Sequence, residues 1–138
     1  MAAYNKFQQF VEDLGNGVHN LTSHTLKLAL SNTAPTNTDQ TFAPASSHPP
    51  PASANGYTSG GESLTNTAFS QTGGTATPAA DKVVYTVASG QLGPFRYAIL
   101  YNDTPTSPAD PLIAYFDYGS SITLADTETL LIDFDGTN

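Results

Sequence analysis

The sequence predicts a mainly β protein: a single-domain antiparallel β-sandwich or small barrel, with a short N-terminal helix and a long Pro-rich loop. Three observations carry this prediction. The second half of the chain contains several runs in which apolar and polar residues alternate with a period of two, as in half-buried strands. Turn-forming residues separate these runs at spacings typical of sandwiches and small barrels. The length of 138 residues suits one domain with one apolar core.

The chain begins with a helical pattern. The apolar residues that recur at i, i+3, i+4 and i+7 are Phe7, Phe10, Val11 and Leu14. Two glycines follow within three residues and are plausible stop signals. We therefore expect a short amphipathic helix over residues 5–14, whose apolar face packs on this chain's own sheet or on a neighbouring subunit.

A strand and a long arm follow the helix. Alternation of Leu26, Leu28 and Leu30 with other residues predicts a strand over residues 24–31. Residues 32–61 are dominated by Pro, Ser, Thr, Ala, Asn and Gly, and their three consecutive prolines favour an extended, solvated backbone. A loop of this length in a compact domain is usually functional or disordered. We expect it to be a surface arm that is disordered or lies across a partner.

The rest of the chain, residues 62–138, is expected to form a β-rich core together with the strand at 24–31. The runs with strand character cover residues 64–71 (weakly), 83–87, 95–101, 112–116 and 130–134. Turns are expected at residues 102–105 and 118–120. No second compositional zone other than the arm marks a domain boundary, so residues 1–138 are predicted to be one domain.

Composition excludes several classes of function. Twelve acidic residues stand against four basic ones, for a net charge of −8, so the surface should repel phosphate backbones and anionic lipids. The absence of cysteine removes disulfides and thiolate chemistry. No apolar run approaches the roughly 20 residues of a membrane-spanning helix, and the start lacks the pattern of a secretion signal. We expect a chain that is made and assembled in the cytoplasm and binds neither nucleic acid nor membrane.

A short motif near the end resembles the haloacid-dehalogenase phosphatase signature, an apolar strand followed by D-x-D-G-T. In that interpretation Asp133 is the nucleophile and Asp135 is the acid/base. The chemistry also needs a Mg²⁺ site, a lysine and a parallel sheet, and the alternating strand and helix pattern of such a sheet is not visible. The preferred interpretation is an apolar strand that runs into an Asp-Gly turn.

Other polar residues also fail to form a recognisable catalytic or metal site. The oxygen ligands at Asp133, Asp135 and Asn138 lack the order of an EF-hand. The histidines at positions 19, 24 and 48 are scattered and form no H-x-x-x-H pair.

The carboxylates that could form a glycosidase pair are Asp103, Asp110 and Asp117, which any acidic β protein could offer. No glycine-rich nucleotide loop or serine-hydrolase elbow is present. We expect a non-enzymatic protein with no metal and no cofactor.

Residues 92–104 and 111–121 carry the most specific pattern of the chain. Together with residues 4–20, 26–35 and 128–136, they resemble a family of small virion structural proteins of tailed bacteriophages. The resemblance covers nearly the whole chain except the arm, and it implies a β-rich domain without catalytic residues. Two departures are the proline content of the arm and the family's short extra strand, which would lie beyond position 138.

The resemblance says little about the position on the particle, and the placement that we expect is a capsid cement or decoration protein on the outer surface of the virion. The implied partners are the major capsid protein and further copies of the chain, with a trimer favoured by the threefold positions of capsids. The residues expected to contact a partner are Phe7, Phe10, His48, Pro49, Pro50, Pro51 and Arg96, although Arg96 could instead pair with a carboxylate inside the sheet. The alternative is a tail-associated structural or carbohydrate-binding module, because seven tyrosines could supply a sugar platform.

Overall fold

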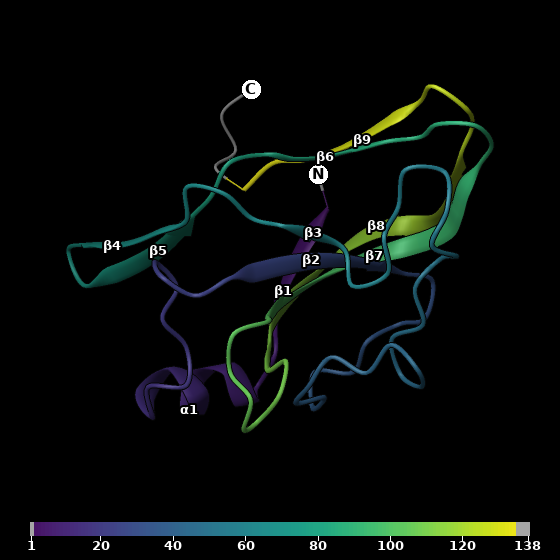
Figure 1. Cartoon of the computed structure of the whole chain (residues 1–138). Helices are drawn as coiled ribbons and strands as arrows, with labels where there is room; N and C mark the ends of the chain where they lie inside the picture. The colour runs from purple at the N-terminus through teal and green to yellow at the C-terminus, as the bar shows by residue number, and fades with distance from the viewer. Residues whose placement is uncertain (1, 135–138) are drawn as a thin grey trace.

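The computed structural model describes residues 2–134 and has one helix among nine strands in that range (Figure 1). The helix is α1 (Gln9–Gly15). The strands are β1 (Ala3–Lys6), β2 (Leu26–Ser31), β3 (Glu62–Ser63), β4 (Ala68–Thr72), β5 (Thr75–Ala79), β6 (Val83–Thr86), β7 (Leu92–Asn102), β8 (Leu112–Leu124) and β9 (Thr129–Ile132). The expectation of a mainly β chain with one short helix is confirmed.

A five-stranded antiparallel sheet forms the centre of the molecule, in the order β1-β8-β7-β2-β3. Its middle is the long hairpin of β7 and β8, and β2 pairs with β7 from Leu26↔Asn102 to Ser31↔Tyr97. The remaining strands form two separate antiparallel pairs, β6–β9 and β4–β5.

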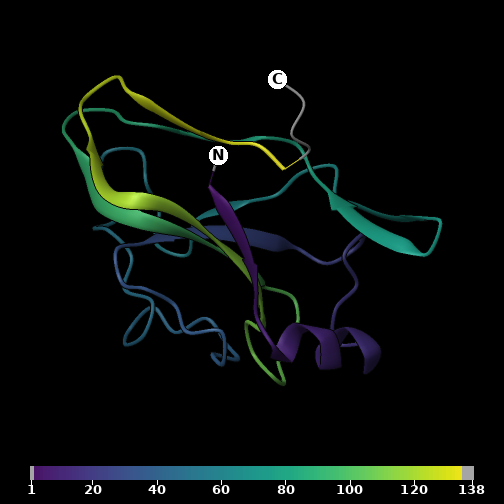
Figure 2. The same ribbon diagram turned by 180° about the vertical axis from the view of Figure 1, so that it is seen from behind.

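Both faces of the central sheet are covered. In both views the β6–β9 ribbon lies over one face, and the first part of the arm lies over the other (Figures 1 and 2). The alternation of side chains along each strand therefore produces two apolar clusters. Under the ribbon, Leu28 and Leu30 pack with Tyr85. Under the arm, Ile99 and Tyr101 pack with Phe42. The result is a sandwich-like domain in which a loop replaces part of the second sheet.

The N-terminal helix is shorter than the sequence predicts. Residues 5 and 6 belong to β1, which pairs with β8, and the helix begins only at Gln9. Val11, expected on the apolar face, is 56% exposed, while Asp13 is buried. A strand partner supplied by β8 outweighs the local helical periodicity, because hydrogen bonds to a neighbouring strand are available from the start of the chain.

The arm packs against this chain's own sheet. Phe42 stacks on Tyr101 with ring centroids 4.4 Å apart, and Thr41 forms an isolated bridge with Pro111. The arm then passes around the sheet, and Tyr57 enters the cluster under the ribbon. The expectation that the whole arm is disordered or lies across a partner is therefore wrong for these residues, because Phe42, Tyr57 and His48 of the arm are buried in the fold.

Two further details of the sequence prediction are corrected. Residues 118–120 do not form a turn but continue β8. The register shifts at this point, because Phe95 pairs with Ile122 and Tyr97 pairs with Asp117, so that five positions of β8 correspond to two positions of β7. Gly119 adopts a positive φ of 97° inside this bulge. β5 was not expected because Gly73, Gly74 and Pro78 indicate a break. The two glycines instead form the turn of the hairpin, and Pro78 is tolerated because β5 lies at an edge.

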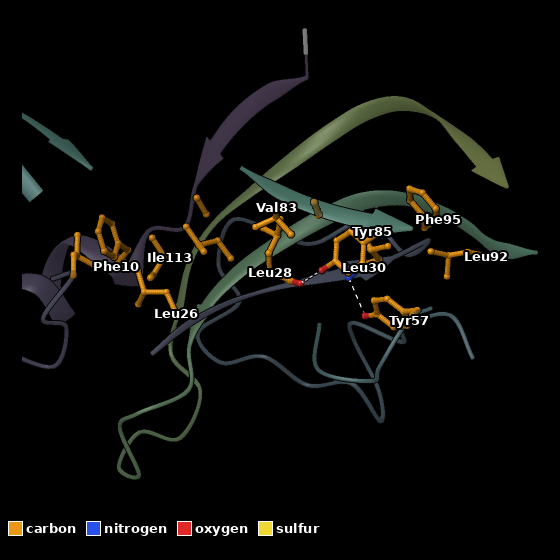
Figure 3. Packing of buried hydrophobic residues seen from close by; sticks show 14 of the residues in the cluster. Phe10, Leu26, Leu28, Leu30, Tyr57, Val83, Tyr85, Leu92, Phe95 and Ile113 are labelled. Atoms are coloured by element: carbon orange, nitrogen blue, oxygen red, sulfur yellow. Dashed lines mark hydrogen bonds between the residues drawn. The ribbon is translucent and has the colours of Figure 1, made fainter. Parts of the chain in front are cut away.

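Tyrosine hydroxyl groups protect the outer edge of β2. Tyr85 donates a hydrogen bond to the carbonyl oxygen of Leu28 and accepts one from the backbone N–H of Glu62 at 3.2 Å. Two residues further along the edge, the N–H of Leu30 donates to the hydroxyl of Tyr57 at 3.1 Å (Figure 3). These hydroxyls satisfy backbone groups where β3 is too short to do so, and they close an edge that could otherwise pair with another chain.

Candidate assembly surface

Four of the seven side chains predicted to contact a partner are buried inside this chain. Phe7 and His48 are completely buried, Phe10 is 9% exposed, and Pro51 is also buried. Phe7 packs against Tyr115 of β8 with ring centroids 5.3 Å apart. The hydrophobic effect favours burial of these groups within the chain, so they are not available to a partner in the folded protein.

The other two prolines of the predicted contact lie nearer the surface. Pro49 is exposed and Pro50 is half-buried. The carbonyl oxygen of Pro49 accepts a hydrogen bond from the Ser31 hydroxyl at 2.9 Å, which fixes the proline run against the end of β2. Pro49 therefore remains a predicted contact, presented on a backbone that the chain itself holds in place.

Arg96 has an internal partner, which is the alternative that the sequence analysis gave to a contact with another protein. Its Nε and NH2 groups donate to the two carboxylate oxygens of Asp117 at 2.7 and 2.9 Å, across the β7–β8 pair. The same carboxylate accepts a hydrogen bond from the N–H of Gly119 at 2.8 Å. The guanidinium of Arg96 and the Gly119 bond lower the pKa of Asp117. This fork stabilises the bulge of β8, so the charge of Arg96 is largely neutralised before any partner arrives.

The Asp39–His48 pair has the residue types of catalytic acid–base chemistry but not the geometry. His48 Nε2 lies 3.1 Å from the Asp39 carboxylate, and His48 Nδ1 accepts a hydrogen bond from the N–H of Ala43 at 3.1 Å. Since a neutral imidazole has one donor and one acceptor nitrogen, both are used within the arm. Neither nitrogen is left to take a proton from a substrate or a nucleophile, so this pair has a structural role.

A second polar cluster lies beside the helix. The side-chain amide of Asn102, which is fully buried, contacts His19 Nδ1 at 3.1 Å and His24 Nδ1 at 2.9 Å. His19 Nε2 and one oxygen of the buried Asp13 have no hydrogen-bond partner. Burial lowers the pKa of His19, while the nearby Asp13 opposes this effect. The cluster joins the segment after the helix to the end of β7, and His19 borders an open hollow that Leu14, Leu21 and Phe69 also line.

The carboxylates singled out as a possible glycosidase pair are only partly brought together, since Asp103 lies near Asp110 while Asp117 lies elsewhere. Asp103 pairs with Lys27 at 2.9 Å, and Asp117 is engaged by Arg96. Burial and the neighbouring Asp103 raise the pKa of Asp110. Within residues 2–134, no group of three or more His, Asp or Glu side chains could hold a metal ion.

The phosphatase-like motif lies in an unsuitable strand. Asp133 follows β9, which pairs only with β6 and runs antiparallel to it, and its carboxylate lies 3.3 Å from Lys82 Nζ. The parallel sheet that the motif requires is not formed around this strand. The other residues of the motif and of the possible calcium site, Asp135 and Asn138, lie outside the described residues.

A groove of about 740 Å³ opens beside the central sheet, and it is lined mostly by apolar side chains. Residues of β1, β2, β7 and β8 in the central sheet line it, and its other walls are β9 and one side of the β4–β5 hairpin, chiefly β5. Aromatic rings concentrate there: Tyr4 and Phe116 have centroids 5.7 Å apart, and Phe116 and Phe134 are also 5.7 Å apart. A large apolar hollow without converging polar groups is suited to contact with another protein rather than to chemistry.

Exposed apolar side chains surround the groove. Tyr4 is 53% exposed, Tyr118 is 57% exposed and Leu131 is 54% exposed, and all three line it. On the outer face of the β6–β9 ribbon, Val84 lies directly opposite Leu131 and is also exposed. The sequence interpretation missed this surface, because its members come from four strands that are distant in the chain. The signal that could have indicated part of it is the alternation around Phe116, which places Tyr118 on the same face.

The charged residues leave an acidic exterior. Three of the four basic side chains are in ion pairs within the chain: Lys27 with Asp103, Lys82 with Asp133 and Arg96 with Asp117. Most of the net charge of −8 therefore comes from carboxylates without a basic neighbour. Such a surface attracts basic partners and repels polyanions. None of the described helices has the length and apolar character needed to cross a membrane.

Comparisons with protein-family models, with curated proteins and with solved structures found no match to this chain. Its function is therefore inferred from the residues and from the surface described above.

Proposed function

We propose that this chain is a structural protein of a tailed-bacteriophage virion, and that it acts as a cement protein on the outer surface of the major capsid shell. The observation that carries the proposal is the apolar groove with its exposed rim of Tyr4, Tyr118 and Leu131. Apolar surface of this kind marks contact with another protein, and a chain of this size that only binds protein suits a structural part of a larger particle. The resemblance to virion structural proteins supports the same role.

The stiffness of the domain supports a cement role. The arm is already packed on the sheet through Phe42, on which His48 stacks, and the β2 edge is closed by Tyr57 and Tyr85. A partner that binds such a surface orders few side chains, so little of the binding free energy is lost to conformational entropy. A protein that joins capsomers against internal pressure benefits from this property, because it resists deformation once it is attached.

Charge provides the second support. With three of its four basic groups neutralised internally, the chain presents an acidic exterior that can be steered to a basic capsid surface. Interactions between exposed charges are screened over about 10 Å at 0.1 M ionic strength. We therefore expect attachment to slow and weaken as the salt concentration rises.

The proposal is tested by counting copies in purified virions. A cement protein should be present in numbers comparable to the major capsid protein, and virions stripped of it should rebind the purified chain and recover resistance to heat. A count of a few copies per particle would overturn the placement on the capsid. Failure of stripped particles to rebind the chain would overturn the cement role even if the copy number were high.

A second candidate is a tail-associated carbohydrate-binding module. It is favoured by one observation, the two exposed tyrosines Tyr4 and Tyr118 that line one groove. Tyrosine side chains of this kind can stack on sugar rings, since each tyrosine combines an apolar aromatic face with a polar hydroxyl. This function predicts a low copy number together with binding to host-surface glycans, and loss of that binding in Tyr118→Ala.

A further inference from the structure

The β4–β5 hairpin projects from the domain, and Ala68 of β4 together with residues 76–79 of β5 lines the groove of its own chain. All ten residues of its two strands are exposed, and its strands pair only with each other (Figures 1 and 2). An isolated two-stranded hairpin is marginally stable in water at best. A hairpin maintained at full register over five residue pairs is therefore expected to find additional contacts outside the chain.

The base of the hairpin is rigidly held. The Asp81 carboxylate accepts hydrogen bonds from the Thr65 hydroxyl at 3.1 Å and from the Asn66 amide at 2.6 Å, which joins the two ends of the hairpin. The Thr67 hydroxyl donates to the carbonyl oxygen of Thr22 at 3.4 Å. The hairpin therefore leaves the domain in a fixed direction, as a preformed projection rather than a loose loop.

The hairpin also lacks charge. Residues 65–80 contain no Asp, Glu, Lys or Arg, in a chain whose net charge is −8. Natural proteins usually protect free strand edges with charged residues, and this hairpin has only Pro78 to do so. The absence of protection on two exposed edges is expected where those edges are covered by a partner.

The groove has matching properties. Of the residues that line it, only Arg96 and Asp133 are charged, and both are in ion pairs within the chain, with Asp117 and Lys82. The groove is hollow and apolar where the hairpin is projecting and uncharged. The hairpin borders the groove of its own chain without filling it, so the hollow stays open to the projecting hairpin of a second copy.

We propose that the β4–β5 hairpin of one copy lies in the apolar groove of a second copy. Copies that carry −8 each repel one another except where uncharged surfaces meet, and the hairpin and the groove are two such surfaces. Because the contact joins two different surfaces, repetition of it closes a ring or extends a chain of subunits. The inference concerns the free protein and stands independently of the capsid as a partner.

The test uses the absence of cysteine from the chain. Two single variants, Ser70→Cys on the hairpin and a differently tagged Tyr118→Cys in the groove, are mixed and oxidised. Since each chain carries one thiol, a mixed disulfide forms only between copies. We expect the mixed product to exceed that formed when Ser70→Cys is replaced by Ser47→Cys, an exposed position in the arm on the other face of the sheet. An equal yield from both pairs would overturn the proposal.

A second measurement addresses affinity. Ser70→Asp places a carboxylate on the hairpin, and Thr86→Asp places one at an exposed position of β6 as the matched control. Both chains should fold, since the replaced residues are exposed. By light scattering across a concentration series, we expect Ser70→Asp to weaken self-association at least about tenfold, the effect of an unpaired charge in an apolar contact, and Thr86→Asp to change it much less.

Two results would overturn the proposal. One is a wild-type chain that remains monomeric at high micromolar concentration. The other is equal association of the two Asp variants. If the hairpin cysteine were to cross-link only to the major capsid protein in virions, self-association through the groove would be wrong while the cement function would be supported. The two proposals can therefore fail separately.

Discussion

Replacement of Tyr85 by phenylalanine should destabilise the fold by removing one oxygen atom. Tyr85 is 1% exposed, and its hydroxyl connects the N–H of Glu62 on β3 to the carbonyl oxygen of Leu28 on β2. Burial raises its pKa well above the ordinary value, so the hydroxyl keeps its proton and donates at any physiological pH. The ring packs in the cluster under the β6–β9 ribbon, and phenylalanine preserves that packing.

The magnitude follows from the groups left behind. Leu28 is fully buried, and its carbonyl oxygen loses its tyrosine donor, whereas the N–H of the exposed Glu62 can turn to water. Leaving a buried acceptor without a partner costs about 1–3 kcal/mol. We therefore expect the free energy of unfolding to fall by about 2 kcal/mol. For a domain of this length the melting temperature should fall by roughly 6–10 °C.

The assay is denaturant and thermal unfolding followed by circular dichroism, with Tyr118→Phe as the control. Tyr118 is 57% exposed, so its hydroxyl can bind water and its loss should change stability by less than about 0.5 kcal/mol. Tyr57→Phe provides a second readout, because the amide of Leu30 should then lose protection from hydrogen exchange. If Tyr85→Phe were no more destabilising than Tyr118→Phe, β3 would have closed directly onto β2, and the structural role given to the hydroxyl would be refuted.

Three further predictions concern other parts of the molecule. Gly61→Ala places a Cβ 1.9 Å from the Leu28 carbonyl oxygen, whereas the Cβ of Gly73→Ala, also at positive φ, meets nothing within 4 Å. In chemical denaturation, Gly61→Ala should lose at least about 2 kcal/mol more stability than Gly73→Ala. Equal losses would contradict the close approach of Gly61 to β2. Burial lowers the pKa of His19, so the unfolded chain binds a proton more readily than the folded chain. Stability should therefore decrease as the pH falls below about 6.5, and His19→Asn should flatten this part of the pH profile of stability. An unchanged profile in the variant would exclude His19 as the cause. The protein should not hydrolyse phosphate esters in the presence of Mg²⁺, and Asp133→Asn should leave its folding intact; turnover that disappears in this variant would establish the phosphatase interpretation of the motif.

The sequence by itself determined the class of the fold and the position of most strands. Period-two alternation predicted β2, β6, β7 and β9 closely, because each has one face in the core and the apolar side chains must follow that face. The charge of −8 and the absence of cysteine are equally properties of the sequence alone. These features depend on residue type and spacing, which require no knowledge of what lies opposite.

Only the tertiary structure decided which surfaces are free. The arm was expected to be disordered or to lie across a partner, but Phe42 packs on the central sheet and His48 is buried against Phe42, because the second face of that sheet needed a cover. The residues at the start of the expected helix, 5 and 6, form part of β1 instead, because they pair with β8. The groove brings together distant parts of the chain, because β1 pairs with β8 at one edge of the sheet and both Tyr4 and Tyr118 line the hollow. Burial and exposure depend on contacts between residues far apart in the sequence, and no local pattern specifies those contacts.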